Sequence, residues 1–210
     1  MKKLILILLT LQSIICNAQI QEDVEILEVK CLSKSTDSLV LGFDKSNPSA
    51  LQRLSVLDSA AKHHAQYLIL HYINTDSLTH WEYTDYPNFA EKVECEDRTG
   101  FKNQTSEICN VEKTYSIINT KYKEKYGTKT NWEEIVDPEF SYKNVLESYR
   151  NSPAHWSIAT NKINKFIGSY TVMVFYKTTR DLTKDQIDKG FVRIVCNTFN
   201  VTVFIEDPKK

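Results

Sequence analysis

The sequence predicts an α+β fold in which a sheet is covered by helices. Segments with helical periodicity and helix-start signals come first, from about residue 47. Segments rich in β-branched and aromatic residues dominate the last third of the chain. No regular alternation of strand and helix is present, so the strands are expected to be mainly antiparallel.

The first eighteen residues have the order of a secretory signal peptide. Two lysines precede an apolar run that is too short to span a bilayer, and small residues at 16–18 favour cleavage before Gln19. A lipoprotein signal would need a small residue where Ile15 stands, so we expect no lipid anchor. We therefore expect a secreted or periplasmic protein, and the lysine-rich start with a compact signal is typical of bacteria.

Composition excludes several classes of function. The 26 Lys and Arg residues nearly balance the 27 Asp and Glu residues, giving a net charge of −1 and no basic surface for nucleic acid. No later stretch approaches twenty apolar residues, so no transmembrane segment is expected. No G-x-S-x-G elbow, H-E-x-x-H helix or phosphate loop occurs, which leaves the common hydrolase and nucleotide motifs unrepresented.

Four cysteines lie beyond the predicted signal peptide. An even number of cysteines in an exported chain favours disulfides, and four allow three connectivities. We expect Cys95 to pair with Cys109 across a short loop, and Cys31 to pair with Cys196. Free buried thiols are the alternative. No C-x-x-C spacing indicates a zinc ribbon or a redox motif.

Residues 19–46 are expected to form an extension with one β-like stretch at 24–29, followed by a single domain at 47–206. The domain begins with a helix, for which Asn47 is a cap and Pro48 the first residue. Apolar residues then recur at helical spacing as far as Tyr72. His64 and His71 lie near that stripe but two turns apart, so we expect packed histidines rather than ligands of one metal ion.

Two more helices and three strands are expected after this helix. A helix is predicted from Glu107 to about Lys123, and another from Asp137 and Pro138 to the break at Ser152 and Pro153. The strands are expected at 166–176, 191–196 and 199–205, with the last two as antiparallel neighbours.

Three short motifs and their order resemble those of the CAP superfamily, also called the SCP or PR-1-like or cysteine-rich secretory protein family, in its bacterial form. His80 follows Thr79, as in the "SH" motif of the family, and Glu107 stands where the family has "GEN". Residues 149–155 read Tyr-Arg-Asn-Ser-Pro-Ala-His and resemble "W-x-N-S-P-G-H" before an "IG" strand, here residues 167–168. The similarity spans roughly residues 47 to 205.

The resemblance implies a three-layer α-β-α sandwich with a central, mainly antiparallel sheet and a cavity at one edge. Carried over by position, the cavity residues would be His80, Glu107 and His155, with Ser152 and Tyr149 beside them. Two imidazoles and one carboxylate suit zinc, which His80 and His155 would bind. A rival for the carboxylate is Glu112.

Departures from the family pattern argue against catalysis. Ile108 replaces the asparagine of "GEN", Ala154 replaces a glycine, and Ser152 stands where animal and plant members have a second glutamate. We therefore expect a non-catalytic binding module for a metal ion, a small apolar ligand or a partner protein. The alternatives are a metal-assisted hydrolase with Glu107 as base, or a structural envelope protein with a vestigial cavity.

Each candidate residue also has a purely structural interpretation. His80 could cap the end of the helical layer through backbone hydrogen bonds, and His155 could satisfy a buried carbonyl group behind Pro153. Glu107 could be an acid placed at a helix N-terminus by the macrodipole.

Overall fold

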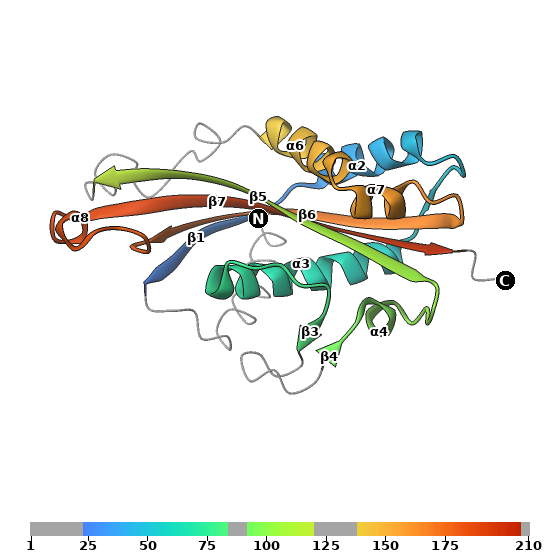
Figure 1. Ribbon diagram of the computed structural model, residues 1–210, viewed down its shortest axis with the longest axis horizontal. Coiled ribbons are helices and arrows are strands. Elements are labelled where there is room, and N and C mark those ends of the chain that lie inside the picture. The colour runs from blue at the N-terminus through green and yellow to red at the C-terminus, as the bar shows by residue number, and fades with distance from the viewer. Residues whose placement is uncertain (1–22, 84–91, 120–137, 207–210) are drawn as a thin grey trace, which may run out of the picture.

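The computed structural model describes residues 23–83, 92–119 and 138–206. The predicted signal peptide therefore lies outside the described residues. The fold is α+β, as predicted, with a central and mainly antiparallel sheet (Figure 1). The helices are α2 (Ser33–Ser46), α3 (Ser55–Thr75), α4 (Cys95–Thr99), α6 (Pro138–Asn151), α7 (Pro153–Ala159) and α8 (Lys184–Asp188). The strands are β1 (Val24–Cys31), β2 (Gln52–Arg53), β3 (Glu82–Tyr83), β4 (Lys92–Val93), β5 (Thr105–Asn119), β6 (Asn164–Thr178) and β7 (Phe191–Glu206).

The main sheet has the strand order β1-β6-β7-β5. All three of these pairings are antiparallel, and the short β2 adds a parallel pairing to the start of β6. The central strands β6 and β7 have residues buried on both parities, so the sheet is covered on both faces. Within the described residues, β5 forms one edge of the sheet.

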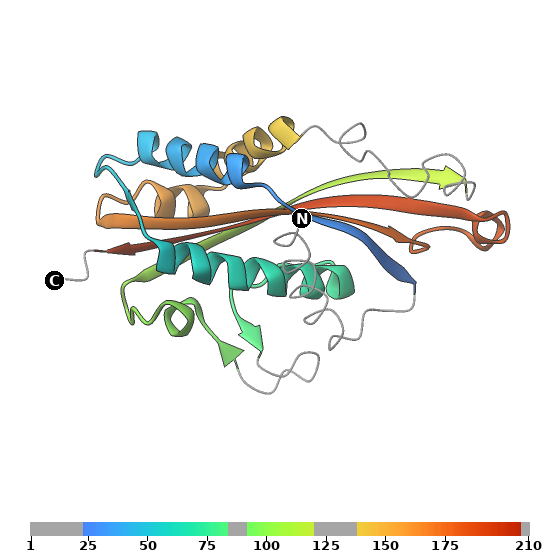
Figure 2. The ribbon, with the colours of Figure 1, turned by 180° about the vertical axis from the view of Figure 1, so that it is seen from behind.

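Helices form a layer on each face of the sheet. Figures 1 and 2 show α3 on one face, together with α4 and the β3–β4 pair, and α2, α6 and α7 on the other. The α3 face buries Leu57, Leu68 and Phe199 in one apolar cluster. The opposite face buries Phe43, Tyr149 and other side chains in a second cluster. Helices α2 and α6 on one face and α3 on the other thus each bury apolar residues against the sheet in a three-layer arrangement.

Residues 23–46 are part of this fold rather than an extension of it. The predicted strand is present as β1, and it pairs with β6 along the edge of the sheet opposite β5. Residues 33–46 form helix α2, which was not predicted, because their serine, threonine and aspartate content suggested a loop. Leu39 and Phe43 of α2 are fully buried against the sheet and α6.

The first predicted helix starts later than its sequence signals indicated. Helix α3 begins at Ser55, because Gln52 and Arg53 pair with β6 as strand β2. The side chain of Asn47 donates hydrogen bonds to the carbonyl oxygens of Ala159 and Asn161 at 3.0 and 3.1 Å. Asn47 therefore ties the end of α2 to the turn after α7 instead of capping α3.

The predicted helix from Glu107 to Lys123 is wrong as far as the described residues reach. Residues 105–119 form strand β5, paired with β7 in continuous register from Thr105–Ile205 to Asn119–Phe191. Apolar residues at three- and four-residue spacing suggested a helix. The neighbouring residues Ile108 and Cys109 are both buried, on opposite faces, so this strand has no period of two for sequence analysis to detect. Since Glu107 lies in a strand, it is not a helix N-terminal acid.

The C-terminal half follows the prediction more closely. Helix α6 begins at Pro138 and ends at Asn151, although Pro153 then opens the further short helix α7. The predicted strand at 166–176 is β6. The two strands predicted at 191–196 and 199–205 are one continuous strand, β7, antiparallel to β6.

Both predicted disulfides are wrong, because all four described cysteines are free. Cys31 on β1 is in register with Val172 of β6, and Val172 is in register with Phe199 of β7, three residues beyond Cys196. The Cα atoms of Cys31 and Cys196 are therefore further apart than two strand spacings, roughly 9–10 Å. A disulfide requires less than about 7 Å. Cys95 lies against Glu107 and Arg98, whereas Cys109 is two residues further along β5 and contacts His80 instead.

Helix α3 approaches β6 closely at Gly168. A Cβ atom added there would lie 2.3 Å from the backbone nitrogen of Asp58 and 2.4 Å from the Cβ of Leu57. The carboxylate of Asp58 also accepts a hydrogen bond of 2.9 Å from the backbone nitrogen of Ser169. The position of α3 therefore depends on residue 168 having no side chain.

Over the described part of the chain, no helix is both long and apolar enough to cross a membrane.

Candidate functional site

The three residues that the motifs singled out lie close together at the β5 edge of the sheet. Glu107 is on β5, His80 is on the segment between α3 and β3, and His155 is on α7. The Nδ1 atom of His80 is 3.8 Å from Oε1 of Glu107, and the rings of His80 and His155 are 6.2 Å apart between centroids. His155 thus comes from one helical layer and His80 from the other, and the two meet at the edge strand.

Arg98 joins two buried carboxylates on the α3 side of this edge. Its guanidinium forms an ion pair with Oε2 of Glu107 and lies 3.4 Å from Oε1 of Glu82. The side chains of Arg98, Glu82 and Glu107 are 4%, 5% and 3% exposed. Buried ions need partners of this kind, because an uncompensated charge in the interior is strongly destabilising.

His64 connects the same two carboxylates from helix α3. Its Nδ1 is 3.1 Å from Oε1 of Glu82, and its Nε2 is 2.8 Å from the carbonyl oxygen of Thr79 and 3.4 Å from Oε1 of Glu107. Carboxylate and carbonyl oxygens accept hydrogen bonds, so these partners are satisfied when both ring nitrogens donate. Arg98 and His64 therefore both contact Glu82 and Glu107.

The two carboxyl groups are held in the ionised form. Burial acts to raise the pKa of Glu82, but hydrogen bonds from His63 and His64 and the charge of Arg98 outweigh it and lower that pKa to about 2. Burial likewise opposes ionisation of Glu107, yet contacts with His80, His64 and Arg98 lower its pKa. The exposed His63 has a raised pKa because it donates to Glu82 at 2.8 Å.

The outer part of the site consists of His80 and His155. The side chain of His80 is 49% exposed, and His155 is half-buried. Burial and the neighbouring His80 lower the pKa of His155, which favours its neutral form. The ring of Tyr149 packs edge-on against His155 at 5.6 Å, while its hydroxyl donates to Oδ1 of Asn200 at 2.9 Å. Tyr149 is fully buried, so it supports His155 from behind rather than offering a free hydroxyl to a ligand.

The rival acid, Glu112, faces the other way. It accepts a hydrogen bond of 3.2 Å from the side chain of Asn110, which also contacts Ser148 of α6. Residues of opposite parity on a strand point to opposite faces, so Glu112 lies on the α6 side of β5 and Glu107 on the α3 side. Ser152 lies at the break between α6 and α7, where its carbonyl oxygen accepts from the backbone nitrogen of Trp156 at 2.8 Å.

Cys109 lies beside His80 but is not a thiolate nucleophile. The sulfur atom is 3.7 Å from Nδ1 of His80. Burial and the nearby charge of Glu107 raise the pKa of the Cys109 thiol to about 12. Because nucleophilic attack requires the thiolate, the raised pKa disfavours Cys109 as a nucleophile at neutral pH.

The residues present do not fit the zinc ion that the resemblance implies. A metal site needs free carboxylate and imidazole ligands, but Glu107 is already paired with Arg98. The cationic guanidinium would also repel a divalent ion at this position. In the described residues, no group of three or more His, Cys, Asp or Glu side chains is arranged to hold a metal ion.

Sequence analysis missed Glu82, Arg98 and the connecting role of His64. His64 was correctly expected to be a packed residue, and it is fully buried. A buried histidine needs a polar partner, and that requirement is a signal that pointed to an acid nearby. The sequence did not indicate which acid, because Glu82 lies 18 residues further on and is not one of the motif positions, although it follows His80 by two residues.

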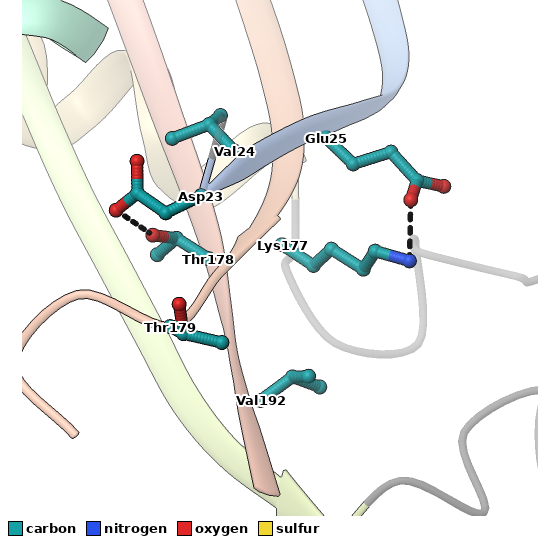
Figure 3. A pocket seen from close by; sticks show the side chains of 7 residues that line it. All are labelled: Asp23, Val24, Glu25, Lys177, Thr178, Thr179 and Val192. Carbon is teal, nitrogen blue, oxygen red and sulfur yellow. Dashed lines mark hydrogen bonds and ion pairs between the residues drawn. The ribbon is translucent and has the colours of Figure 1, made fainter. Parts of the chain in front are cut away.

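A separate surface pocket of about 430 Å³ lies at the far end of the sheet. It is formed by the start of β1, the end of β6 and the start of β7 (Figure 3). Its charged lining residues all have partners: Lys177 forms an ion pair with Glu25, and Asp23 accepts from Thr178 at 3.4 Å and pairs with Arg180, outside the lining, at 2.9 Å. None of the residues predicted from the sequence lines this pocket.

Comparisons with known proteins add little to this description. No family model matches the chain, and no curated protein matches it. A solved structure of an outer surface protein from Borrelia burgdorferi is similar over 86% of this chain and 100% of its own chain, at 12% sequence identity and a TM-score of 0.42. That level of similarity supports no argument about function.

Proposed function

We propose that this chain is an exported, non-catalytic binding module of the CAP type, which binds a small apolar ligand at the β5 edge beside His80 and His155. The pairing of the buried polar groups with one another is the observation that carries this proposal. Arg98 and His64 already contact both buried carboxylates, so neither Glu82 nor Glu107 is free to act as a base. A site of this kind favours a neutral ligand.

Hydrolysis is not favoured by the same contacts. A general base must be free to accept a proton, but Glu107 is held ionised by Arg98 and has a lowered pKa. Cys109 is a protonated thiol. Among the described residues, the acid that contacts His80 is Glu107 at 3.8 Å, and that carboxylate is already paired with Arg98.

The proposal can be tested by native mass spectrometry of the mature protein after incubation with a panel of fatty acids and sterols. Retention of one ligand per chain, lost in a His80→Ala/His155→Ala variant, is expected. A Lys189→Ala variant on the exposed end of helix α8 serves as the matched control, because its charge lies in a surface ion pair with Asp185. Retention that is equal in the double variant would refute the site, and turnover of ester substrates that requires Glu107 would favour the hydrolase.

A further inference from the structure

We propose that the β3–β4 pair carries a binding surface for a neutral carbohydrate, on which a flat sugar ring stacks against the exposed Trp81. The surface, called here the outer aromatic face, consists of Trp81, Tyr83, Lys92 and Glu94. Figure 1 shows the β3–β4 pair on the side of the molecule farthest from α2, α6 and α7. The outer aromatic face uses neither histidine of the β5 edge, so this inference and the proposed function fail separately.

Strand alternation brings these four side chains to one face. Glu82 is buried on the inner side of β3, so its neighbours Trp81 and Tyr83 lie on the outer side. Tyr83 is opposite Lys92 in the antiparallel register, which places Lys92 on the outer side as well. Glu94 is two residues beyond Lys92 and forms an ion pair with it at 2.6 Å.

Two contacts fix the indole ring of Trp81. Its Nε1 atom donates a hydrogen bond of 3.2 Å to the hydroxyl of Tyr83. The ammonium of Lys92 lies 4.3 Å from the centroid of the ring, within the range of a cation–π contact. Trp81 nevertheless remains 39% exposed. A ring that is both fixed and exposed loses little conformational freedom when a ligand stacks on it, so the surface is preorganised for binding.

The groups around the ring favour a neutral ligand that is rich in hydroxyl groups. A sugar of the glucose configuration carries its hydroxyl groups at the rim and C–H groups on its flat faces, and these C–H groups pack on aromatic rings. The ammonium of Lys92 donates to such hydroxyl groups, and the carboxylate of Glu94 accepts from them. Both side chains are accessible, with exposed fractions of 46% and 55%.

Two other kinds of partner fit this face less well. An anionic membrane surface attracts clusters of basic residues, but the charge of Lys92 is balanced by Glu94. A stable protein interface buries about 800 Å² on each partner, which is more than the exposed parts of four side chains supply. A single sugar ring, by contrast, is close in size to one indole ring.

The test measures the binding of cellohexaose and chitohexaose to the mature protein by calorimetry. Both are neutral, β-linked hexasaccharides of the glucose configuration, and they differ in the N-acetyl groups of chitohexaose. We expect at least one of them to bind with a Kd on the order of 1 mM or below. Trp81→Ala should weaken this binding at least about tenfold, because buried tryptophan contacts dominate small interfaces. Trp81→Phe keeps an aromatic ring and should retain most of the affinity.

Leu41→Ala is the matched control, since it removes an exposed apolar side chain from α2 in the opposite helical layer. It should bind as wild type does, and an unchanged Tm checks that each variant is folded. The proposal is overturned if neither hexasaccharide binds to wild type, or if Trp81→Ala binds as tightly as wild type. Binding to phosphatidylglycerol vesicles that requires Trp81, without binding to either hexasaccharide, would overturn it in favour of a membrane surface.

Discussion

Replacing Gly168 with alanine should displace helix α3 from the sheet. The new Cβ would lie 2.3 Å from the backbone of both Leu57 and Asp58, whereas ordinary contacts at Cβ are 3.4–4 Å. The helix must therefore withdraw by about 1 Å or more, because the obstructing atoms belong to its backbone and cannot rotate away. Overpacking costs about 1–3 kcal/mol, and a backbone clash lies at the upper end of that range.

A second loss adds to this cost. Withdrawal of α3 stretches the 2.9 Å hydrogen bond from the backbone nitrogen of Ser169 to Asp58, which contributes about 1 kcal/mol. The predicted loss in the free energy of unfolding for Gly168→Ala is therefore about 3–4 kcal/mol. Urea denaturation followed by circular dichroism measures it, with an unchanged m-value as the check that the unfolded state is the same.

Gly42→Ala is the matched control for this measurement. The three atoms nearest to its Cβ all belong to the side chain of Leu146, with Cδ2 at 2.8 Å, and that side chain can change rotamer. Alanine also has the higher helix propensity, so Gly42→Ala should stay within about 1 kcal/mol of wild type. A loss below about 1 kcal/mol for Gly168→Ala would refute the argument that close approach at residue 168 sets the position of α3.

Three further results are expected. The pKa of Glu82 is about 2 in the folded protein, against an ordinary value of 4.5, so the stability that Glu82 contributes is present above pH 4.5 and is lost as the pH falls toward 2. Glu82→Gln should therefore reduce the loss of stability at acid pH, measured as the free energy of unfolding against pH. An unchanged acid loss would contradict the contacts of Glu82 with His63, His64 and Arg98. In native protein, maleimide should label the exposed Cys31 and leave Cys109 unlabelled until urea unfolds the chain, whereas a mass lower by two hydrogens would reveal a disulfide. Tyr149→Phe should lower the free energy of unfolding by about 1–2 kcal/mol through the lost bond to Asn200, and equal stability would show that the hydroxyl is replaced by water.

The sequence predicted those elements whose local signals agree with their tertiary environment. Strands β6 and β7 are β-branched and aromatic on both parities and are covered on both faces. Helix α6 begins at the predicted proline. Strand β5 was predicted as a helix because burial on both faces removes its alternation. Helix α2 was missed because its serine, threonine and aspartate residues suggested a loop.

The residues of the candidate site were also predicted only in part. The proximity of His80, Glu107 and His155 was implied by the resemblance of their motifs to those of the CAP superfamily. Glu82 and Arg98 carry no motif, and their roles arise only when α4, β3 and β5 meet. Charge compensation in a buried cluster is a property of three-dimensional neighbours, which a single sequence does not reveal.

The place of β7 in the sheet has a consequence for when folding can begin. Strand β7 is the last described element in the chain, yet it lies inside the sheet between β6 and β5. The first strand, β1, pairs with β6 across a separation of about 150 residues. Closing this long loop costs conformational entropy, and that cost must be met before the β1–β6 pairing can form. During synthesis, the sheet therefore cannot be completed until β7 has been made, as far as residue 206. We expect the strands made earlier to remain without their full set of partners for nearly the whole of synthesis.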